Sequence, residues 1–321
     1  MKKIIAGVVA LAMLLTFVLP FAALAEAKKL RVVTTVFPIY DWVREIAGES
    51  DGLEITLLLD SGVDLHSYQP TAQDLMKIAA CDVFACVGGE SDGWVDAALA
   101  GTNAPGRRVV KLIDALGDDI KAEEVVEGME READADHEEG EAEADEHVWL
   151  SLRNARKLVR ALADALGEAD PVRTGMYAAN ADAYAEKLAA LDEAYAAARA
   201  DADFDTLLFG DRFPFRYLAD DYGLNYYAAF SGCSAESEAS FETIVFLAGM
   251  VDELGLTSVL TLEGSDRRIA DTIVANTRAK DAKVLSLDSM QATTGDDVKN
   301  GATYLGAMQR NLEVFRQALK K

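Results

Sequence analysis

The chain contains two series of short β-branched runs that alternate with helical stretches, and this alternation constrains the fold more than any other feature. The first series begins with residues 30–37 and extends to residue 113, and the second extends from residue 206 to residue 319. Strands that alternate with helices form parallel β-α-β units. We therefore expect an α/β fold with two sandwich lobes, each built on a parallel sheet flanked by helices.

A long helical pattern separates the two series. Residues 171–200 are rich in alanine, and larger apolar residues recur at three- and four-residue spacings without an interior glycine or proline after Gly175. A helix of this length measures about 40 Å, and the pattern is too short and too rich in alanine for a coiled coil. It predicts a rigid helix over residues 169–201 that joins a first lobe (29–168) to a second lobe (202–321).

The N-terminus has the features of an export signal. Two lysines are followed by an apolar run up to Leu24, and Ala23 and Ala25 supply a small-x-small cleavage pattern. We expect a signal peptide over residues 1–25, cleaved after Ala25, and a monomeric protein in the periplasm or at the cell surface. The alternative is an uncleaved membrane anchor, because the run comes close to the length that spans a bilayer.

An acidic segment interrupts the first series at residues 123–146. It carries thirteen Asp or Glu residues against one Arg, which is half of the net charge of −24. Such a composition predicts a disordered or mobile acidic loop. The negative charge of the chain excludes nucleic acid as a partner, since phosphate binding requires a basic surface.

Few residues in the chain are typical transition-metal ligands of the nitrogen or sulfur type. The three histidines are His66, His137 and His147, and the three cysteines are Cys81, Cys86 and Cys233. His66 lies in a predicted strand-to-helix loop, where open α/β sheets bind ligands. A single histidine is nonetheless more often structural than a ligand. Cys81 and Cys86 are either a disulfide pair or two small buried hydrophobic residues.

Two histidine motifs give the chain a resemblance to a known family. The first runs from His66 through Ser-Tyr-Gln to Pro70 with Asp74 following, and the second is His147-Val-Trp-Leu-Ser. With the strand at residues 33–40, and Leu287-Asp288-Ser289 followed by Gly301-Ala-Thr-Tyr, they resemble the metal-binding receptors of ABC importers. This family includes the zinc receptor ZnuA and the manganese receptor TroA, and the resemblance covers essentially the whole mature chain.

The resemblance implies a metal site in a cleft between the lobes. His66 and His147 would come from the first lobe and Asp288 from the second. Imidazole nitrogen and carboxylate oxygen both suit zinc, and manganese is the alternative ion. The implied partner is an ABC transporter permease with its cytoplasmic ATPase.

One position departs from the family pattern. The third family ligand, a histidine or glutamate, corresponds to Arg212, and a guanidinium cannot bind a cation. Asp211 is the candidate replacement, with Cys233 or Glu238 as alternatives, or a water beside the other three ligands. Equally, Asp211 and Arg212 could only pair with each other or cap the following helix.

His137 lies within the acidic segment, where zinc receptors of the family commonly carry a histidine- and acid-rich insertion. It is a candidate accessory metal residue that collects zinc or senses its excess, and the alternative is a solvated run of charges. The cysteine and this segment favour zinc, whereas extra carboxylates would favour manganese.

An enzyme and a surface adhesin or structural protein are the two alternatives to a receptor. The sequence has no His-Glu-x-x-His, Gly-x-Ser-x-Gly or phosphate-binding glycine loop. We therefore expect no enzymatic activity. A zinc hydrolase is the alternative function for a chain with a metal site. A surface adhesin or structural protein of the same fold would require no metal.

Overall fold

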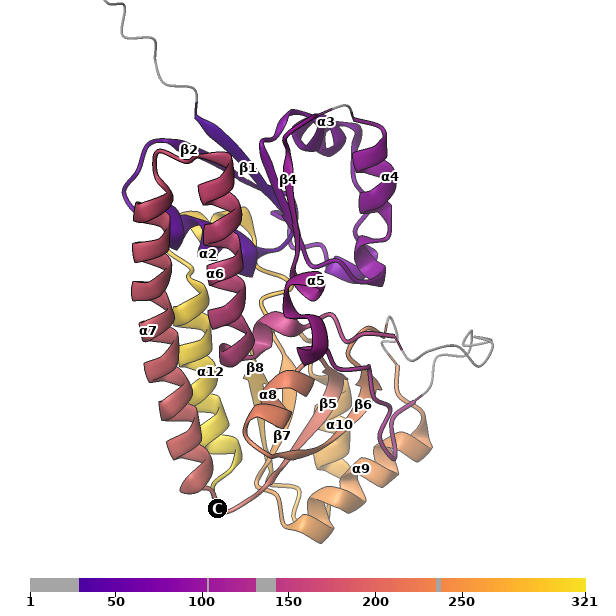
Figure 1. Ribbon diagram of the computed structural model, residues 1–321. Helices are drawn as coiled ribbons and strands as arrows, with labels where there is room; N and C mark the ends of the chain where they lie inside the picture. The colour runs from indigo at the N-terminus through magenta and orange to yellow at the C-terminus, as the bar shows by residue number, and fades with distance from the viewer. Residues whose placement is uncertain (1–28, 103, 131–142, 235–237) are drawn as a thin grey trace, which may run out of the picture.

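The computed structural model describes residues 29–102, 104–130, 143–234 and 238–321. It contains two four-stranded sheets in which every strand pair is parallel (Figure 1). The first sheet consists of β1 (Leu30–Thr34), β2 (Leu53–Leu57), β3 (Val83–Cys86) and β4 (Arg108–Lys111). The second consists of β5 (Thr206–Phe213), β6 (Asn225–Ser231), β7 (Ser258–Leu262) and β8 (Lys283–Leu287). The prediction of two parallel α/β lobes is confirmed.

The two sheets have the same strand order. It is β2-β1-β3-β4 in the first lobe and β6-β5-β7-β8 in the second, so the order reverses beside β1 and beside β5. Ligands of open α/β sheets bind at the carboxyl ends of the strands near such a reversal. A binding site is therefore expected at the carboxyl edge of each sheet, around the loops that follow β1 and β3 in the first lobe and β5 and β7 in the second. The loops after β2 and β6 lie at the same two edges.

Helices cover the sheets and connect the strands. The described helices of the first lobe and the connection are α2 (Phe37–Ala47), α3 (Ala72–Ala80), α4 (Trp94–Ala100), α5 (Leu112–Leu116), α6 (Leu152–Ala169) and α7 (Thr174–Ala200). Those after β5 are α8 (Arg216–Asp221), α9 (Phe241–Leu254), α10 (Arg268–Asn276), α11 (Gly295–Lys299) and α12 (Tyr304–Ala318). Short 3₁₀ helices include η1 (Leu65–Ser67), η2 (Glu90–Asp92), η3 (Gly117–Asp119) and η4 (Val148–Leu150). Within the part of the chain that is described, none of the helices has the length and apolar character needed to cross a bilayer.

The long helix α7 runs along the side of the molecule, from the first lobe to the far end of the second (Figure 1). It packs against α2 and α6 on one side and against α12, the last helix of the chain. Its buried residues include Tyr177, Tyr184, Leu188 and Tyr195, the residues whose spacing predicted the helix. The helix therefore contacts elements on both sides of the cleft.

Two local predictions require correction. The last strand of the first series, which the β-branched pattern extends to residue 113, ends at Lys111, because Leu112 begins the short helix α5. The acidic segment 123–146 is not mobile at its ends: Glu123 donates its backbone N–H to the Glu143 carbonyl, and Asp145 donates its own to Lys121. Residues 131–142, with His137, lie outside the described residues.

Candidate metal centre

The candidate site lies between the two lobes. A pocket of about 360 Å³ lies beside it and is lined by Asp64 and Ser67 from the first lobe and by Arg212 and Ser234 from the second. His66, His147 and Cys233 are next in sequence to these residues or close to them, but they do not line this pocket. The residues that line it follow β2 or belong to β5 and the loop after β6. Loops at the carboxyl ends of the two parallel sheets therefore meet at a common cleft, and this is the edge at which open α/β sheets bind ligands.

His66 is fixed by hydrogen bonds on its backbone and on its ring. It lies in η1, where the Asp64 side chain accepts the His66 backbone N–H at 3.0 Å and begins the turn. The ring nitrogen Nδ1 lies 2.7 Å from Oγ of Ser91, a residue of η2 in the loop after β3. The Ser91 hydroxyl can accept a hydrogen bond from Nδ1–H, and in this tautomer Nε2 of His66 carries the free lone pair.

His147 is fully buried at the start of η4. Oδ1 of Asp145 accepts two hydrogen bonds from it, the backbone N–H at 2.9 Å and the ring Nδ1–H at 3.0 Å. A carboxylate on Nδ1 orients an imidazole and makes Nε2 a better metal ligand. Both histidines thus present Nε2 and hold Nδ1 in a hydrogen bond.

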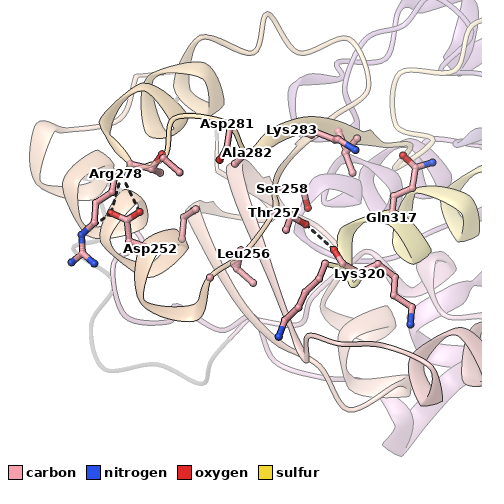
Figure 2. Close-up of a pocket in the computed structure, with 16 residues that line it drawn as sticks. Asp252, Leu256, Thr257, Ser258, Arg278, Asp281, Ala282, Lys283, Gln317 and Lys320 are labelled. Carbon is pink, nitrogen blue, oxygen red and sulfur yellow. Dashed lines mark hydrogen bonds and ion pairs between the residues drawn. The ribbon is translucent and has the colours of Figure 1, made fainter.

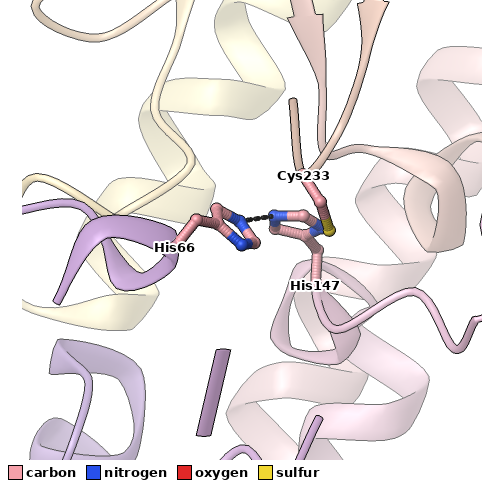
Figure 3. A group of neighbouring side chains, drawn as sticks. All are labelled: His66, His147 and Cys233. Atoms are coloured by element: carbon pink, nitrogen blue, oxygen red, sulfur yellow. Dashed lines mark hydrogen bonds between the residues drawn. The ribbon is translucent and has the colours of Figure 1, made fainter. Parts of the chain in front are cut away.

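The two Nε2 atoms lie 3.2 Å apart, with the rings facing each other (Figure 3). Two nitrogens bound to one tetrahedral zinc ion at about 2.0 to 2.1 Å are separated by about 3.3 Å. The spacing of the imidazoles therefore already matches shared coordination. In the metal-free protein the same distance is a hydrogen bond, and one of the two nitrogens must then carry a proton.

Electrostatics act in opposite directions on the pKa values of the two rings. Burial and the charge of His147 lower the pKa of His66 to about 4, so His66 is neutral at physiological pH. Burial alone would lower the pKa of His147 as well, but the Asp145 carboxylate outweighs it and raises this pKa above its ordinary value. These shifts favour His147 as the donor of Nε2–H to the neutral ring of His66, and a metal ion would replace this proton.

Cys233 joins the two histidines. The ligand atoms of His66, His147 and Cys233 lie within 4.8 Å of one another. Among the described residues, no other group of three or more His, Cys, Asp or Glu side chains meets this criterion. The Cys233 side chain comes from the loop after β6 and points toward the His147 ring (Figure 3). Burial and the nearby Glu123 carboxylate raise the pKa of its thiol, so the metal-free protein holds it protonated.

The structure does not bring the two expected carboxylates into this group. Asp211 lies within β5 rather than in a loop after it, because the strand continues past an irregularity in its pairing to Phe213. Its Oδ1 accepts the Arg212 backbone N–H at 2.9 Å, and its Oδ2 accepts that of Leu262 at 3.2 Å. Its side chain is therefore occupied by the backbone.

Asp288 is also engaged elsewhere. Its Oδ1 accepts the Met290 backbone N–H at 2.9 Å, and its Oδ2 accepts from Arg310 at 3.3 Å. Glu238, the other alternative, is exposed and is not a member of the group. Cys81 and Cys86 are free and buried, so they form no disulfide.

Arg212, at the position of the third family ligand, forms an ion pair across the cleft. Its Nη2 donates to Oδ2 of Asp64 at 2.7 Å. Although burial acts in the opposite direction, this hydrogen bond and the charge of Arg212 lower the pKa of Asp64. The guanidinium is thus neutralised by the first lobe and does not face the histidines as a free charge.

Sequence reasoning did not identify the residues that support the ligands. Ser91 carries no sequence signal, since its contact with His66 joins two loops of the sheet edge. Glu146 is buried and accepts the Ser91 backbone N–H at 2.8 Å, although it had been assigned to a mobile segment. Asp145 could have been found, because an aspartate two residues before a histidine is able to hydrogen-bond its ring.

A second pocket lies far from this site. It measures about 590 Å³ and is bounded by α9, α12 and the starts of β7 and β8 (Figure 2). A hydrogen bond from Thr257 to the Lys320 carbonyl and the Asp252–Arg278 ion pair border it. None of the predicted ligands lines it, so its size does not make it the metal site.

The comparisons with known proteins agree on one family. Residues 32–318 match the family model of ZnuA, described as the periplasmic component A of a zinc-uptake complex. The zinc-binding lipoprotein AdcA of Streptococcus pneumoniae is 34% identical over 293 residues, which cover 90% of this chain and 56% of the relative. The high-affinity zinc uptake system protein ZnuA of Bacillus subtilis is 27% identical, over 92% of this chain and 89% of the relative.

Solved structures show the same fold. The Zn(II)-bound ZnuA-like domain of S. pneumoniae AdcA superposes with a TM-score of 0.70 at 29% identity, over 91% of this chain and 99% of that chain. The metal-dependent lipoprotein YcdH of B. subtilis superposes with a TM-score of 0.73 at 26% identity, with coverage of 91% and 99%. The chain spans about half the length of the AdcA proteins that it matches.

Proposed function

Since the chain belongs to the ZnuA family of periplasmic zinc-uptake components, we propose that it captures a zinc ion between its two lobes and delivers it to an ABC importer. The family is one of uptake components, and the chain is accordingly not an enzyme. The observation that carries the proposal is the pair of Nε2 atoms 3.2 Å apart, each on a ring whose Nδ1 is held by a hydrogen bond. Manganese, the alternative ion, prefers oxygen ligands, and this pair offers nitrogen.

The residues around the pair prepare it for a cation. Asp145 and Ser91 orient the rings, so little ordering remains to be done when the ion arrives. The charge of Asp145 favours the ion directly and lies beside the deeper ring. When zinc binds, the proton shared by the two rings leaves to solvent, and the ion takes its place.

Membership of a family of periplasmic uptake components supports the proposals of export and delivery. The mature receptor would be extracytoplasmic, with residues 1–25 removed after Ala25, and would act as a monomer. It would present the loaded cleft to a permease that is driven by a cytoplasmic ATPase. The acidic segment 123–146 with His137 would collect zinc at low affinity and pass it to the cleft.

A competition titration tests the proposal. Metal-stripped protein should bind one zinc ion tightly, and His66→Ala and His147→Ala should each abolish tight binding. His137→Ala is the matched control, because it removes a histidine that is not part of the pair. Zinc should also raise the melting temperature, since a ligand at 100 times its Kd stabilises the native state by about 2.7 kcal/mol.

The same titrations test the two carboxylates. If the contacts of Asp211 and Asp288 persist with metal bound, Asp288→Asn and Asp211→Asn leave zinc affinity unchanged. Tight zinc binding that survives both histidine replacements would contradict the proposed site. Manganese that competes with zinc on equal terms would contradict the proposed ion.

A further inference from the structure

The position of Cys233 beside the histidines is fixed by its own backbone and by the glycine that precedes it. The Cys233 backbone N–H donates to Oε1 of Glu123 at 3.1 Å, which ties the loop after β6 to the first half of the chain. The preceding residue, Gly232, lies so close to His147 that a Cβ there would be 3.0 Å from Cε1 of the ring. The absence of a side chain at Gly232 is what lets the cysteine loop approach the imidazole.

Arg212 connects the cysteine loop to the loop of His66. One nitrogen of its guanidinium donates to Asp64, whose other oxygen holds the backbone N–H of His66. Another donates to the carbonyl of Ser234 at 3.4 Å, the residue after Cys233. A continuous series of polar contacts therefore runs from one candidate ligand, through Asp64 and Arg212, to the other.

We infer that Cys233 is the third protein ligand of the zinc ion and that Arg212 acts as a positioning residue for it. The inference rests on the proposed zinc-binding function and names the ligand that the second lobe supplies. A tetrahedral zinc ion would hold the sulfur about 3.6 Å from each nitrogen that binds it. The sulfur already lies within 4.8 Å of one ring nitrogen of each histidine, so a shift of about 1 Å brings it to that distance from those nitrogens. As the zinc–sulfur bond forms, the thiol proton passes to solvent.

The set of two imidazoles and one thiolate determines which ions the site accepts. Thiolate is a soft ligand that favours zinc and disfavours manganese, which prefers carboxylate, carbonyl and water oxygens. Three protein ligands leave the fourth tetrahedral position for water. In this arrangement Cys233 is a specificity-determining residue, because its thiolate strengthens the preference for zinc over manganese that the two imidazoles already give.

Cobalt substitution of the wild-type protein tests the ligand directly and requires no mutation. Cobalt(II) bound through a thiolate gives an intense sulfur-to-cobalt charge-transfer band in the near ultraviolet, and cobalt bound through nitrogen and oxygen alone does not. We expect this band at one equivalent of cobalt, and we expect zinc to remove it by displacement.

Cys233→Ser is the informative variant, with Cys81→Ser as its matched control. The Cys81 thiol is buried and donates to the Ile78 carbonyl, a hydrogen bond that serine can also make. Cys233→Ser should lose the cobalt band and more than about 100-fold in zinc affinity, because the loss of a mere hydrogen-bond partner of a ligand already costs 10- to 100-fold. It should lose less manganese affinity than zinc affinity. The control should retain the band and the affinity.

Arg212→Gln tests the positioning role. It should keep the cobalt band, because the thiol is still present, and should weaken zinc binding less than Cys233→Ser does. An unchanged zinc affinity would remove the positioning role.

The outcomes separate this inference from the proposed function. If the wild-type protein binds zinc tightly and depends on both histidines but shows no charge-transfer band, Cys233 is not a ligand and the receptor function stands. The same conclusion follows if Cys233→Ser binds zinc as tightly as the wild type. If the wild type binds no zinc at all, the proposed function fails together with the inference.

Discussion

Asp41 makes the stability of the metal-free protein depend on pH in a direction opposite to that of most carboxylates. It is completely buried in α2. Its Oδ2 accepts the backbone N–H of Tyr304 at 2.7 Å, where α12 begins, and its Oδ1 accepts from Arg44. Burial raises the pKa of this carboxyl from 3.8 to about 6, although the Tyr304 N–H and the Arg44 charge act against the shift.

The size and sign of the effect follow from linkage. Between about pH 4 and pH 6 the folded protein holds a proton on Asp41 that the unfolded chain has released, so the free energy of unfolding falls as pH rises through this range. One pKa unit corresponds to 1.36 kcal/mol, and the difference between about 6 and 3.8 therefore amounts to about 3 kcal/mol. The stabilisation is fully present below pH 4 and is lost above pH 6.

Urea unfolding of the metal-free wild type and of Asp41→Asn, between pH 3.5 and pH 7.5, measures this contribution. The variant cannot titrate at this position, so the wild type minus variant difference should fall by about 3 kcal/mol as pH rises. The difference removes contributions from other groups, among them Asp92, whose pKa burial also raises to about 6. Asp164→Asn, an exposed change on α6, controls for the loss of one charge. A wild type minus Asp41→Asn difference that stays constant across this range would refute the reasoning.

Three further predictions concern the site and its supports. Asp145→Asn removes the carboxylate from the His147 ring and should lower zinc affinity about 10- to 100-fold in a competition titration. Gly232→Ala places a Cβ 3.0 Å from the same ring and should cost about 1 to 3 kcal/mol of unfolding free energy by chemical denaturation, the usual range for overpacking. Tyr304→Phe removes the hydrogen bond from the Tyr304 hydroxyl to the buried Trp149 carbonyl and should cost about 1 to 3 kcal/mol in the same assay.

The fold was predictable because its signals are local. β-Branched runs and helical periodicity predicted the two series of strands and helices on either side of a long helix, and the structure contains all three. Local signals also begin individual helices: Thr71 and Asp74 form a capping box with both reciprocal hydrogen bonds at the start of α3. The helix α4 was not predicted, since seven residues that begin with Trp94 give too few turns for a periodic pattern. Short elements depend on tertiary packing more than on their own sequence.

The site was predictable only in part, for a related reason. The residues around His66 and His147 form recognisable motifs, and the structure brings the two rings together. Which side chain joins the two histidines depends on two features of the second lobe. Asp211 lies next to the irregularity in β5, where backbone N–H groups occupy its carboxylate, and the loop after β6 carries Cys233 to the cleft. These features arise from contacts between segments that lie far apart in the sequence, and no pattern within one segment encodes them.

The contacts between the lobes also determine how much of the metal-binding free energy is needed to bring the lobes together. Asp41 receives a hydrogen bond from the start of α12, and the indole of Trp149 donates to the carbonyl of Ser289 at 2.9 Å. Arg212 also pairs with Asp64 across the cleft. Because the lobes are already joined by buried contacts and by α7, little of the binding free energy is needed to close them. The affinity of the site should therefore follow the chemistry and spacing of its ligands, which makes the identity of the third ligand the decisive property of this receptor.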